Sequence, residues 1–342
     1  MSHITIALEE IRTTTATALK AHGAKEWIAE EVAKAVEKAE ANGNLICGLY
    51  YLESYCQQLL SGRVNGTVDP TVSVPKPASV KVDAGYGFAQ SAFSKGLPEA
   101  LKVAAKAGTC SLAICHSHTC TSLGYFTEQI AQAGFIGIGL TNASAVVSPP
   151  GGNKPVLGTN PIAMAVPAAG HQQQGRDQTK GGVRFQFDQS TSAIALGKIT
   201  MAAAAGEEIP PGWAIDSDGN PTTDPNAALK GSLVSTGGYK GYGFGLMAEV
   251  LAAAVTGSVN SVDSSALKAP EGKPHNLGQF YFLLDPEVFS GGEFWQRLDT
   301  LAEAVNAQPG ARLPGSKQRS VNEVSIEIAV WKKTQELASY TG

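Results

Sequence analysis

Residues 151–161 form the segment that most constrains this chain, because a glycine pair and a Gly-Thr-Asn-Pro turn separate two apolar runs at 135–140 and 162–166. Glycine permits positive φ angles and lets the backbone approach a ligand closely. Thr159 and Asn160 bring a hydroxyl and an amide to the turn, and a proline fixes the exit. An ordinary surface turn can share this composition, but polar groups on a rigid turn between strands are typical of binding sites. The segment therefore predicts two strands joined by a candidate ligand-binding turn.

The length and the low charge predict a large core and extensive interfaces. The 342 residues allow two or three packed units of about 100–200 residues each. Hydrophobic residues make up 43% of the chain and charged residues only 16%, which argues against disorder. A net charge of -4 without a Lys/Arg run argues against a nucleic-acid partner. No apolar stretch approaches the roughly 20 residues of a membrane helix, and Met1 is not followed by a secretion signal, so we expect a cytoplasmic protein.

The cysteines raise the question of a metal site. There are five, an odd number, which predicts free thiols in a reducing compartment. Residues 115–120 read Cys-His-Ser-His-Thr-Cys. This spacing matches no standard Cys/His zinc pattern, and no second ligand pair follows downstream. We therefore expect no metal.

Helical and strand-like apolar patterns alternate along the chain and predict an α/β core. Two helices are expected within residues 4–42, with a break at His22-Gly23. The polar segment 167–182 is expected to be a loop, and the segment 209–229, rich in Pro, Gly and Asp, is expected to lie over the surface. The other expected helices cover 50–60, 91–107, 122–133, 191–206, 245–257, 294–306 and 321–340. The expected strands cover 72–75, 79–83, 110–115, 135–141, 162–166, 183–188 and 279–284.

A glycine-rich segment at 237–245 is the best candidate for a phosphate site. No Gly-x-Gly-x-x-Gly pattern follows the first expected strand, which argues against the Rossmann fold. We expect residues 237–245 to form a loop that leads into a helix. Such a loop offers free N–H groups and the positive end of the helix dipole to an anion, and Lys240 adds a full charge. The alternative is a plain helix-entry loop with a solvated lysine.

Six segments together resemble the type-2 malate/L-lactate dehydrogenase family, over nearly the whole chain; they cover residues 157–161, 187–192, 209–216, 221–225, 237–243 and 312–315. The resemblance implies reduction of a 2-keto acid or a cyclic 2-imino acid with NADPH, or with NADH, by a homodimer. It implies a non-Rossmann α/β fold of mixed sheets with N- and C-terminal helices. The implied domains are a helical domain (1–70 and 300–342), a central dimerisation and substrate domain (71–120 and 240–299) and an NAD(P)-binding domain (121–239).

The same resemblance implies which residues contact the cofactor and the substrate. The expected cofactor residues are Ser117, Thr119, Cys120, Thr121, Ser122, Leu123, Asp188, Gln189, Ser190, Tyr239, Lys240, Arg312, Gly315 and Lys317. Thr159 matches a substrate-contacting threonine, and Asn160 beside it is a second candidate.

The chain departs from the family at the expected catalytic corner. The family has Ser-His-Gly after the second helix and an arginine four residues beyond that histidine, whereas this chain has Cys47 and Tyr51 there. In the family the histidine donates a proton and the arginine holds the substrate carboxylate. Thr119 replaces another histidine, and Lys198 stands where the imine-reducing branch has an aspartate. Cys47, His118 and Lys198 are the candidate catalytic residues and Tyr51 is a candidate substrate contact; packing or solvation is the alternative role for each.

These departures favour one substrate class. Hydride addition to a ketone creates an alkoxide and needs a proton donor, whereas a protonated imine is already electrophilic. A thiol, with an ordinary pKa of about 8.5, is a weak hydrogen-bond donor, so losing the histidine harms ketone reduction more. We favour a reductase of a cyclic imine such as Δ1-pyrroline- or Δ1-piperideine-2-carboxylate. A 2-hydroxy acid dehydrogenase using Cys47 or His118, and a cofactor-binding protein without turnover, remain the alternatives.

Overall fold

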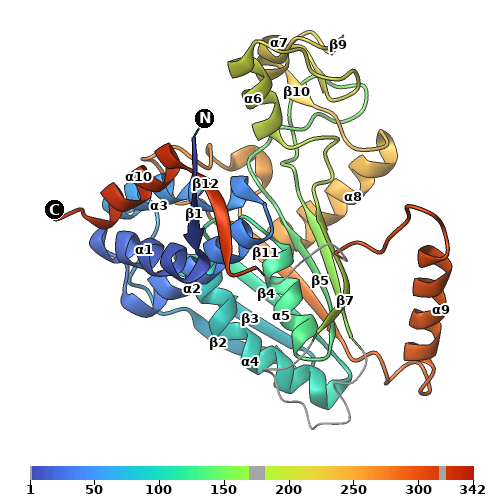
Figure 1. Ribbon diagram of the computed structural model, residues 1–342. Coiled ribbons are helices and arrows are strands. Elements are labelled where there is room, and N and C mark those ends of the chain that lie inside the picture. The colour runs from blue at the N-terminus through green and yellow to red at the C-terminus, as the bar shows by residue number, and fades with distance from the viewer. Residues whose placement is uncertain (1, 169–181, 316–320) are drawn as a thin grey trace.

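The computed structural model describes residues 2–168, 182–315 and 321–342 and is built around one mixed sheet (Figure 1). In this part of the chain the sheet has seven strands in the order β2-β3-β4-β11-β5-β6-β7. β3 and β4 pair in parallel, and the other neighbours pair antiparallel. The strands are β2 (Thr71–Lys76), β3 (Ser79–Asp83), β4 (Thr109–Ser117), β5 (Ile136–Thr141), β6 (Ile162–Pro167), β7 (Val183–Gln189) and β11 (Leu277–Leu284). This architecture confirms the predicted mixed α/β class.

Two helices, α4 (Ala89–Ala107) and α5 (Gly124–Gln132), cover one face of the sheet. The ring of Phe93 meets the rings of Phe126 and Tyr281 edge-on, with centroids 4.9 and 5.1 Å away. A Cβ atom at Gly139 would lie 3.0 Å from the Tyr281 ring, so glycine makes room for it in the sheet. Burying each such ring contributes about 1.5–3 kcal/mol and holds both helices against the strands.

The opposite face is covered by α8 (Tyr239–Glu249) and the π-helical turn η3 (Val250–Ala254). Gly278 and Tyr281 are three residues apart on β11, so they face opposite sides of the sheet. A Cβ atom at Gly278 would lie only 1.8 Å from the carbonyl oxygen of Ala252. Glycine at this position is therefore what allows the turn to pack so closely on β11.

The two ends of the chain meet in a helical unit. β1 (His3–Ala7) pairs antiparallel with β12 (Glu323–Glu327), and Ile4 is opposite Ile326. The helices of this unit are α1 (Leu8–Ala21), α2 (Glu26–Ala41), α3 (Leu52–Leu60) and α10 (Ile328–Ala338). They share a core that includes Ile28, Tyr55 and Trp331. Two short 3-10 turns, η1 (Leu45–Cys47) and η2 (Leu49–Tyr51), lead from α2 into α3.

A third, smaller unit stands above the sheet in Figure 1. It contains α6 (Leu196–Ala205), α7 (Pro225–Lys230) and a three-stranded sheet of β8 (Ala214–Ile215), β9 (Pro221–Thr222) and β10 (Ser232–Leu233). Isolated bridges join Val147 to Leu157 and to Leu233, so the glycine-rich turn of 151–161 is attached to this unit. Its core includes Ile199 and Ile209.

Several local predictions are wrong. Residues 3–7 and 323–327 form strands and not helix ends, because they pair with each other across almost the whole sequence. Residues 239–245 belong to α8 and not to a loop, and the helix predicted at 191–206 begins only at Leu196. Most of the remaining helices and strands lie close to their predicted bounds. Residues 169–181 of the predicted loop are outside the described residues.

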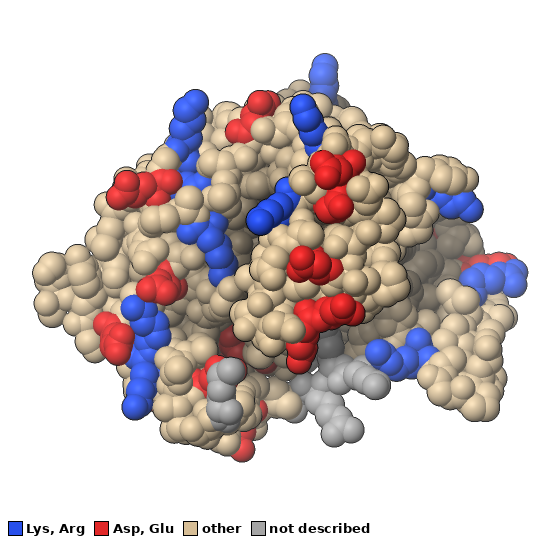
Figure 2. All heavy atoms as spheres, turned by 90° about the horizontal axis from the view of Figure 1, so that it is seen from above, with Lys and Arg blue, Asp and Glu red and all other residues tan. Residues whose placement is uncertain are grey.

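The face of the molecule seen in Figure 2 is weakly charged. Charges of both signs are interspersed among broad uncharged areas on the face seen in Figure 2. α9 (Phe294–Asn306) stands apart from the sheet in Figure 1, buries only Ala302, and is tied to β7 by an ion pair of 2.8 Å between Arg184 and Asp299. Among the described residues, none of the helices combines the length and apolarity needed to cross a membrane.

Candidate active site

The loop between β4 and α5 holds most of the predicted cofactor residues. The buried Ser117 hydroxyl accepts a hydrogen bond of 2.6 Å from Gln279 and donates one of 2.9 Å to the carbonyl of His118. The Thr119 N–H donates to Nδ1 of His275 at 3.2 Å. Thr121 adopts a φ of 59°, which turns the chain. Cys120 and Leu123 are buried below this turn, while Thr121 and Ser122 are half-exposed at its surface. The loop is therefore a fixed rim with two accessible hydroxyls.

Asp188, at the end of β7, holds this loop by hydrogen bonds. Its Oδ2 accepts hydrogen bonds from the Gly124 N–H at 2.7 Å and from the Ser122 hydroxyl at 3.3 Å. A Cβ atom at Gly124 would lie 3.0 Å from Cβ of Asp188, so the contact needs a glycine. Asp188 has an exposed surface, yet the protein around its carboxyl removes water from it and raises its pKa, and the hydrogen bonds from residues 122–124 oppose this shift. Asp188 lies on β7 but accepts a hydrogen bond from the backbone N–H at the start of α5. This role differs from capping α6, the helix that follows Asp188 in sequence. Gln189 is exposed and Ser190 is half-exposed beyond it.

Residues 312–315 close the other side of the same pocket. The Gln186 N–H donates to the Pro314 carbonyl at 3.2 Å. Gly315 has a φ of 81°, and a Cβ atom there would lie 3.1 Å from both backbone N and O of Gln186. The pocket has a volume of about 330 Å³, and Arg312 is an exposed cation on its wall. Its lining also includes Asn44, Ser122, Asp188 and Gly315. Lys317 lies outside the described residues.

Cys47 lies near Asp188 of this pocket, and Tyr51 lies near Cys47. Cys47 ends η1, where its N–H bonds the Asn44 carbonyl at 2.9 Å. Burial, with the nearby charge of Asp188, raises the pKa of the Cys47 thiol to about 12. Burial also raises the pKa of Tyr51, and Cys47 is the next contributor. Both side chains are partly exposed, yet the protein around them excludes enough water to disfavour their charged forms, as in a cleft. At neutral pH the corner therefore presents a protonated thiol and a protonated phenol.

The corner is held by a buried carboxylate of α2. Glu40 accepts a hydrogen bond of 2.7 Å from the Leu49 N–H, and burial raises its pKa. A Cβ atom at Gly48 would lie 2.1 Å from Oε1 of Glu40, so only glycine fits between the two 3-10 turns. This arrangement fixes the backbone on both sides of Gly48 and hence the positions of Cys47 and Tyr51.

Lys268 is a site residue that the sequence did not indicate. Its Nζ lies 3.1 Å from the centre of the Tyr50 ring and 4.7 Å from that of Tyr51. Burial lowers the pKa of Lys268 to about 8, against the opposing charge of Glu53. A lone lysine in a loop 218 residues from Tyr50 carries no motif, so no sequence signal marked it. It places a cation beside the position where the family has its arginine.

Two buried side chains pin the loop that carries Lys268. Arg63 donates to the Lys273 carbonyl at 3.0 Å, to the Ala266 carbonyl at 2.9 Å and to the Ala269 carbonyl. Gln58 donates to the carbonyls of Leu267 and Ala269 at 2.8 and 2.7 Å. Gln58 is part of α3 and Arg63 follows it, so these hydrogen bonds hold the loop of Lys268 against α3, the helix that begins directly after Tyr51.

The other two candidate catalytic residues differ in access. His118 is only 1% exposed, its Nε2 lies 2.6 Å from Oε1 of Gln58, and its ring stacks on His275 at 3.9 Å. Burial, followed by the neighbouring His275, holds the pKa of His118 well below its usual range, so the ring is neutral. Lys198 is exposed on α6. Its neighbour Gly197 lies close to Ile46 of η1, since a Cβ atom on Gly197 would be 3.2 Å from the Ile46 side chain.

Thr159 and Asn160 differ in exposure and in the protein groups that they bind. Asn160 is fully buried with a φ of 34°, and its Nδ2 donates to Glu249 at 2.8 Å and to the Gly245 carbonyl at 3.2 Å. Thr159 is half-exposed, and its carbonyl accepts from the Thr191 N–H at 2.9 Å. The amide of Asn160 is thus occupied by protein partners, and Thr159 is the member of the pair with accessible surface.

The start of α8 forms a separate anion-binding candidate. Gly237 and Gly238 have φ of 61° and 65°, and Gly238 has no side chain to cap the helix. Tyr239 is 73% exposed, and Lys240 follows it at the exposed first turn. Gly238 lines a pocket of about 520 Å³ shared with the glycine-rich turn of 151–161. Ser122, Asp188 and Arg312 therefore line one pocket, while the start of α8 contributes Gly238 to another, directly before Tyr239 and Lys240.

Comparisons with known proteins place the whole chain among dehydrogenases and reductases. The chain is 37% identical over 316 residues to the (2R)-3-sulfolactate dehydrogenase (NADP(+)) of Chromohalobacter salexigens, covering 92% of this chain and 91% of that protein. It is 34% identical over 335 residues to a Δ1-pyrroline-2-carboxylate/Δ1-piperideine-2-carboxylate reductase of Pseudomonas putida, covering 98% and 95%. The structure of Δ1-piperideine-2-carboxylate reductase from Pseudomonas syringae superimposes with a TM-score of 0.89 at 32% identity, covering 98% of this chain and 99% of that one.

The family model for malate/L-lactate dehydrogenase matches residues 6–333. This match spans the sheet, both pockets and most of the helical unit. It confirms the predicted family and the assignment as an NAD(P)-dependent oxidoreductase. The chain belongs to the malate/L-lactate dehydrogenase family.

Proposed function

We propose that this protein is an NADPH-dependent reductase of a small cyclic 2-imino acid, of the Δ1-pyrroline- or Δ1-piperideine-2-carboxylate class. The observation that carries the proposal is the Cys47 thiol, whose pKa of about 12 makes it a poor proton donor at the predicted catalytic corner. A protonated cyclic imine needs no donor at the moment of reduction, because hydride addition to C2 gives the neutral amine directly. The names of the Pseudomonas relatives support this substrate class.

The cofactor is NADPH, with NADH as a second possibility, and it lies against the pocket of Asp188 and Arg312. The pocket suits a nucleotide because the half-exposed Ser122 and the cation of Arg312 line it, and because Gly315 has no side chain to fill it. Arg312 is positioned for the 2′-phosphate that distinguishes NADPH. When bound, the reduced nucleotide supplies the hydride. Tyr239, Lys240 and the start of α8 hold a phosphate by the helix dipole and one charge.

The substrate lies between Cys47, Tyr51 and Thr159, and Lys268 binds its carboxylate. Tyr51 donates a hydrogen bond from its protonated phenol, and the ammonium of Lys268 supplies the charge that the family draws from an arginine. Lys198 gives further positive charge at the edge of the corner. His118, buried and neutral, positions Gln58 and through it the loop of Lys268.

A 2-hydroxy acid dehydrogenase is the second candidate, and the 37% identity to the sulfolactate enzyme favours it. A panel assay separates the candidates. NADPH oxidation is measured with both cyclic imines and with keto acids such as pyruvate and oxaloacetate. We expect kcat/KM to be highest for a cyclic imine. A preference for keto acids would support the dehydrogenase, and tight NADPH binding without any turnover would leave a protein that only binds the cofactor.

The protein forms a cytoplasmic homodimer in this proposal, with the three domains divided as the family resemblance implies. The five free cysteines suit a reducing compartment. α8 and η3 present an apolar stripe of Phe244, Leu246, Met247, Val250 and Val255, each at least 42% exposed, on the side away from the sheet. A second copy of the chain covers this stripe.

The dimer is tested by light scattering on the wild type and on two matched variants. Phe244→Arg, in the stripe, should halve the particle mass. Leu60→Arg, equally exposed on α3, should leave it unchanged. A monomeric wild type, or a dimer that survives the first substitution, would remove α8 from the interface.

A further inference from the structure

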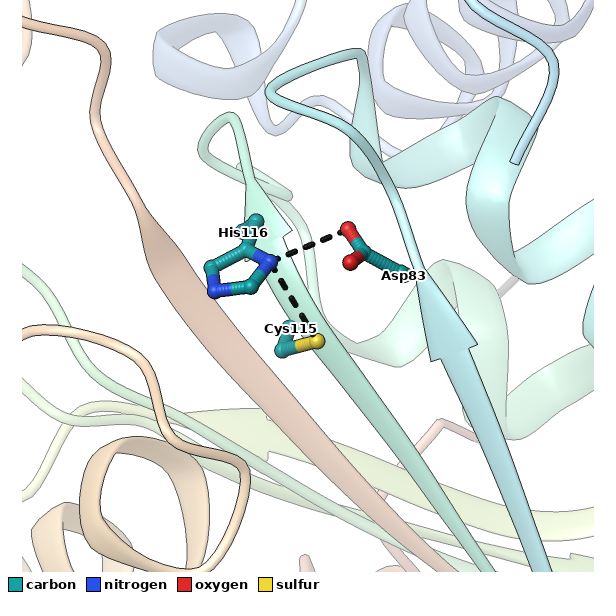
Figure 3. A group of neighbouring side chains, drawn as sticks. All are labelled: Asp83, Cys115 and His116. Carbon is teal, nitrogen blue, oxygen red and sulfur yellow. Dashed lines mark hydrogen bonds and ion pairs between the residues drawn. The ribbon is translucent and has the colours of Figure 1, made fainter. Parts of the chain in front are cut away.

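Three potential metal ligands meet where β3 and β4 end, directly before Ser117 and His118 in the chain (Figure 3). Oδ1 of Asp83, Sγ of Cys115 and Nδ1 of His116 all lie within 4.8 Å of one another. Nδ1 is 3.0 Å from the carboxylate oxygen and 3.7 Å from the sulfur. The sequence argued against a metal because the Cys-His-Ser-His-Thr-Cys run lacks a second ligand pair. Asp83 comes from another strand, 33 residues from His116, so the run alone could not indicate it.

The backbone is bent to create this group. Asp83 is the register partner of Cys115 in the parallel pair of β3 and β4. Adjacent strand residues normally point to opposite faces, which would separate the side chains of Cys115 and His116. His116 instead adopts a φ of 51°, a strained value for a residue with a side chain, and its imidazole returns to the side of the thiol. Such strain is found where the surrounding structure or a function requires it.

The two distances from Nδ1 of His116 suit a tetrahedral cation. Zinc is bound by nitrogen or oxygen at about 2.0 Å and by sulfur at about 2.3 Å, which separates nitrogen from sulfur by about 3.6 Å and nitrogen from oxygen by about 3.3 Å. The observed 3.7 and 3.0 Å are close to these values. Cys115 is buried, while the side chains of His116 and Asp83 are 32% and 42% exposed, so a cation can enter from solvent.

We propose that Asp83, Cys115 and His116 bind one zinc-class divalent cation, with water completing the tetrahedron. The cation joins the ends of β3 and β4, and it is independent of the proposed imine reduction. On binding, the Cys115 thiol loses its proton to solvent and the sulfur–metal bond forms, with no change in oxidation state. The imidazole binds through Nδ1 in place of its hydrogen bond to Asp83.

The test uses Co²⁺ alone as the probe, titrated into the full-length protein after treatment with a chelator. We expect one equivalent per chain, the near-ultraviolet charge-transfer absorption of a cobalt–thiolate bond, and displacement by Zn²⁺. Cys115→Ser should abolish that absorption. His116→Asn, which tolerates the left-handed backbone, and Asp83→Asn should each weaken Zn²⁺ binding by at least about tenfold. Cys110→Ser is the matched control, since Cys110 is another buried thiol on β4, and it should leave binding unchanged.

The wild-type spectrum tests the proposed cation site even if a variant fails to fold. Absence of the thiolate absorption in the wild type, or its persistence in folded Cys115→Ser, would overturn the site. A folded state is checked by circular dichroism for every variant. Loss of the absorption in Cys110→Ser but not in Cys115→Ser would place the metal elsewhere and overturn it as well.

Discussion

The ammonium group of Lys268 lies 4.7 Å from the centre of the Tyr51 ring, although the two residues come from distant parts of the chain. The family resemblance implies a carboxylate-binding arginine at the position of Tyr51, and Lys268 brings a cation to this corner from another loop. Arg63 and Gln58 hold that loop through its backbone carbonyls. The following predictions test this corner, the cofactor pocket and the buried network behind Thr159.

Replacing Lys268 should weaken binding of the acid substrate. Lys268→Met removes the charge but keeps most of the stem, and a charged hydrogen bond contributes about 1.5–3 kcal/mol, so KM should rise about tenfold to a hundredfold. Lys268→Arg should retain most of the affinity. Steady-state kinetics with a cyclic imino acid, compared with a decarboxylated cyclic imine, measures this. Equal losses on both substrates would show that Lys268 does not contact the carboxylate.

The same lysine predicts a pH dependence. Burial lowers the pKa of Lys268 to about 8, so in the free enzyme its ammonium is complete well below that pH and is lost above it. A bound carboxylate favours the charged form, so affinity is present at low pH and declines as the pH rises through about 8. KM measured over this range should therefore increase. In Lys268→Arg the increase should disappear, because arginine stays protonated; an unchanged profile in that variant would assign the titration to another group.

Cys47→His should raise ketone reduction more than imine reduction. An imidazole supplies the proton donor that a thiol of pKa about 12 does not, and general acid catalysis contributes about 10²–10⁴-fold. Cys47→Ser is the control and should leave imine reduction largely intact while lowering any ketone reduction. The measurement is kcat/KM for one imine and one keto acid in each variant. Parallel changes on both substrates would contradict the role assigned to the imine proton.

Two cations should affect the nucleotide differently. Arg312→Ala should raise KM for NADPH about tenfold or more and affect NADH much less, because only NADPH carries the 2′-phosphate. Lys240→Ala should weaken both nucleotides, since it removes charge beside a shared phosphate. Calorimetric titration with both nucleotides gives the affinities. If Lys240→Ala binds both as the wild type does, the start of α8 is not part of the cofactor site.

Asn160→Ala should destabilise the fold. It leaves Glu249 without the 2.8 Å hydrogen bond from Nδ2, in a network where Glu249 also accepts from the N–H of Ser261 at 2.6 Å. An unsatisfied buried polar group costs about 1–3 kcal/mol. Asn153→Ala, which removes an exposed hydrogen bond in the same turn, is the control and should change the free energy of unfolding little. Denaturant unfolding measures both, and equal effects would mean that burial of the network contributes nothing.

The sequence determined the features that depend on nearby residues. The spacing of apolar residues identified α4, α5 and the strands of the central sheet, because a buried face repeats with the period of its own helix or strand. It also determined the family, since motifs such as residues 157–161 are carried by contiguous residue types. The absence of a histidine at Cys47 and of an arginine at Tyr51 was readable for the same reason.

Only the tertiary structure decided which distant residues share a site. The pairing of β1 with β12, the approach of Lys268 to Tyr51 and the meeting of Asp83 with Cys115 and His116 each join separate parts of the chain. Local periodicity carries no information on such contacts, because they follow from how helices and strands pack. The tertiary structure also decided which polar side chains are exposed to solvent. His118 and Thr159 both lie in turns next to strands, yet packing buries His118 and leaves Thr159 half-exposed.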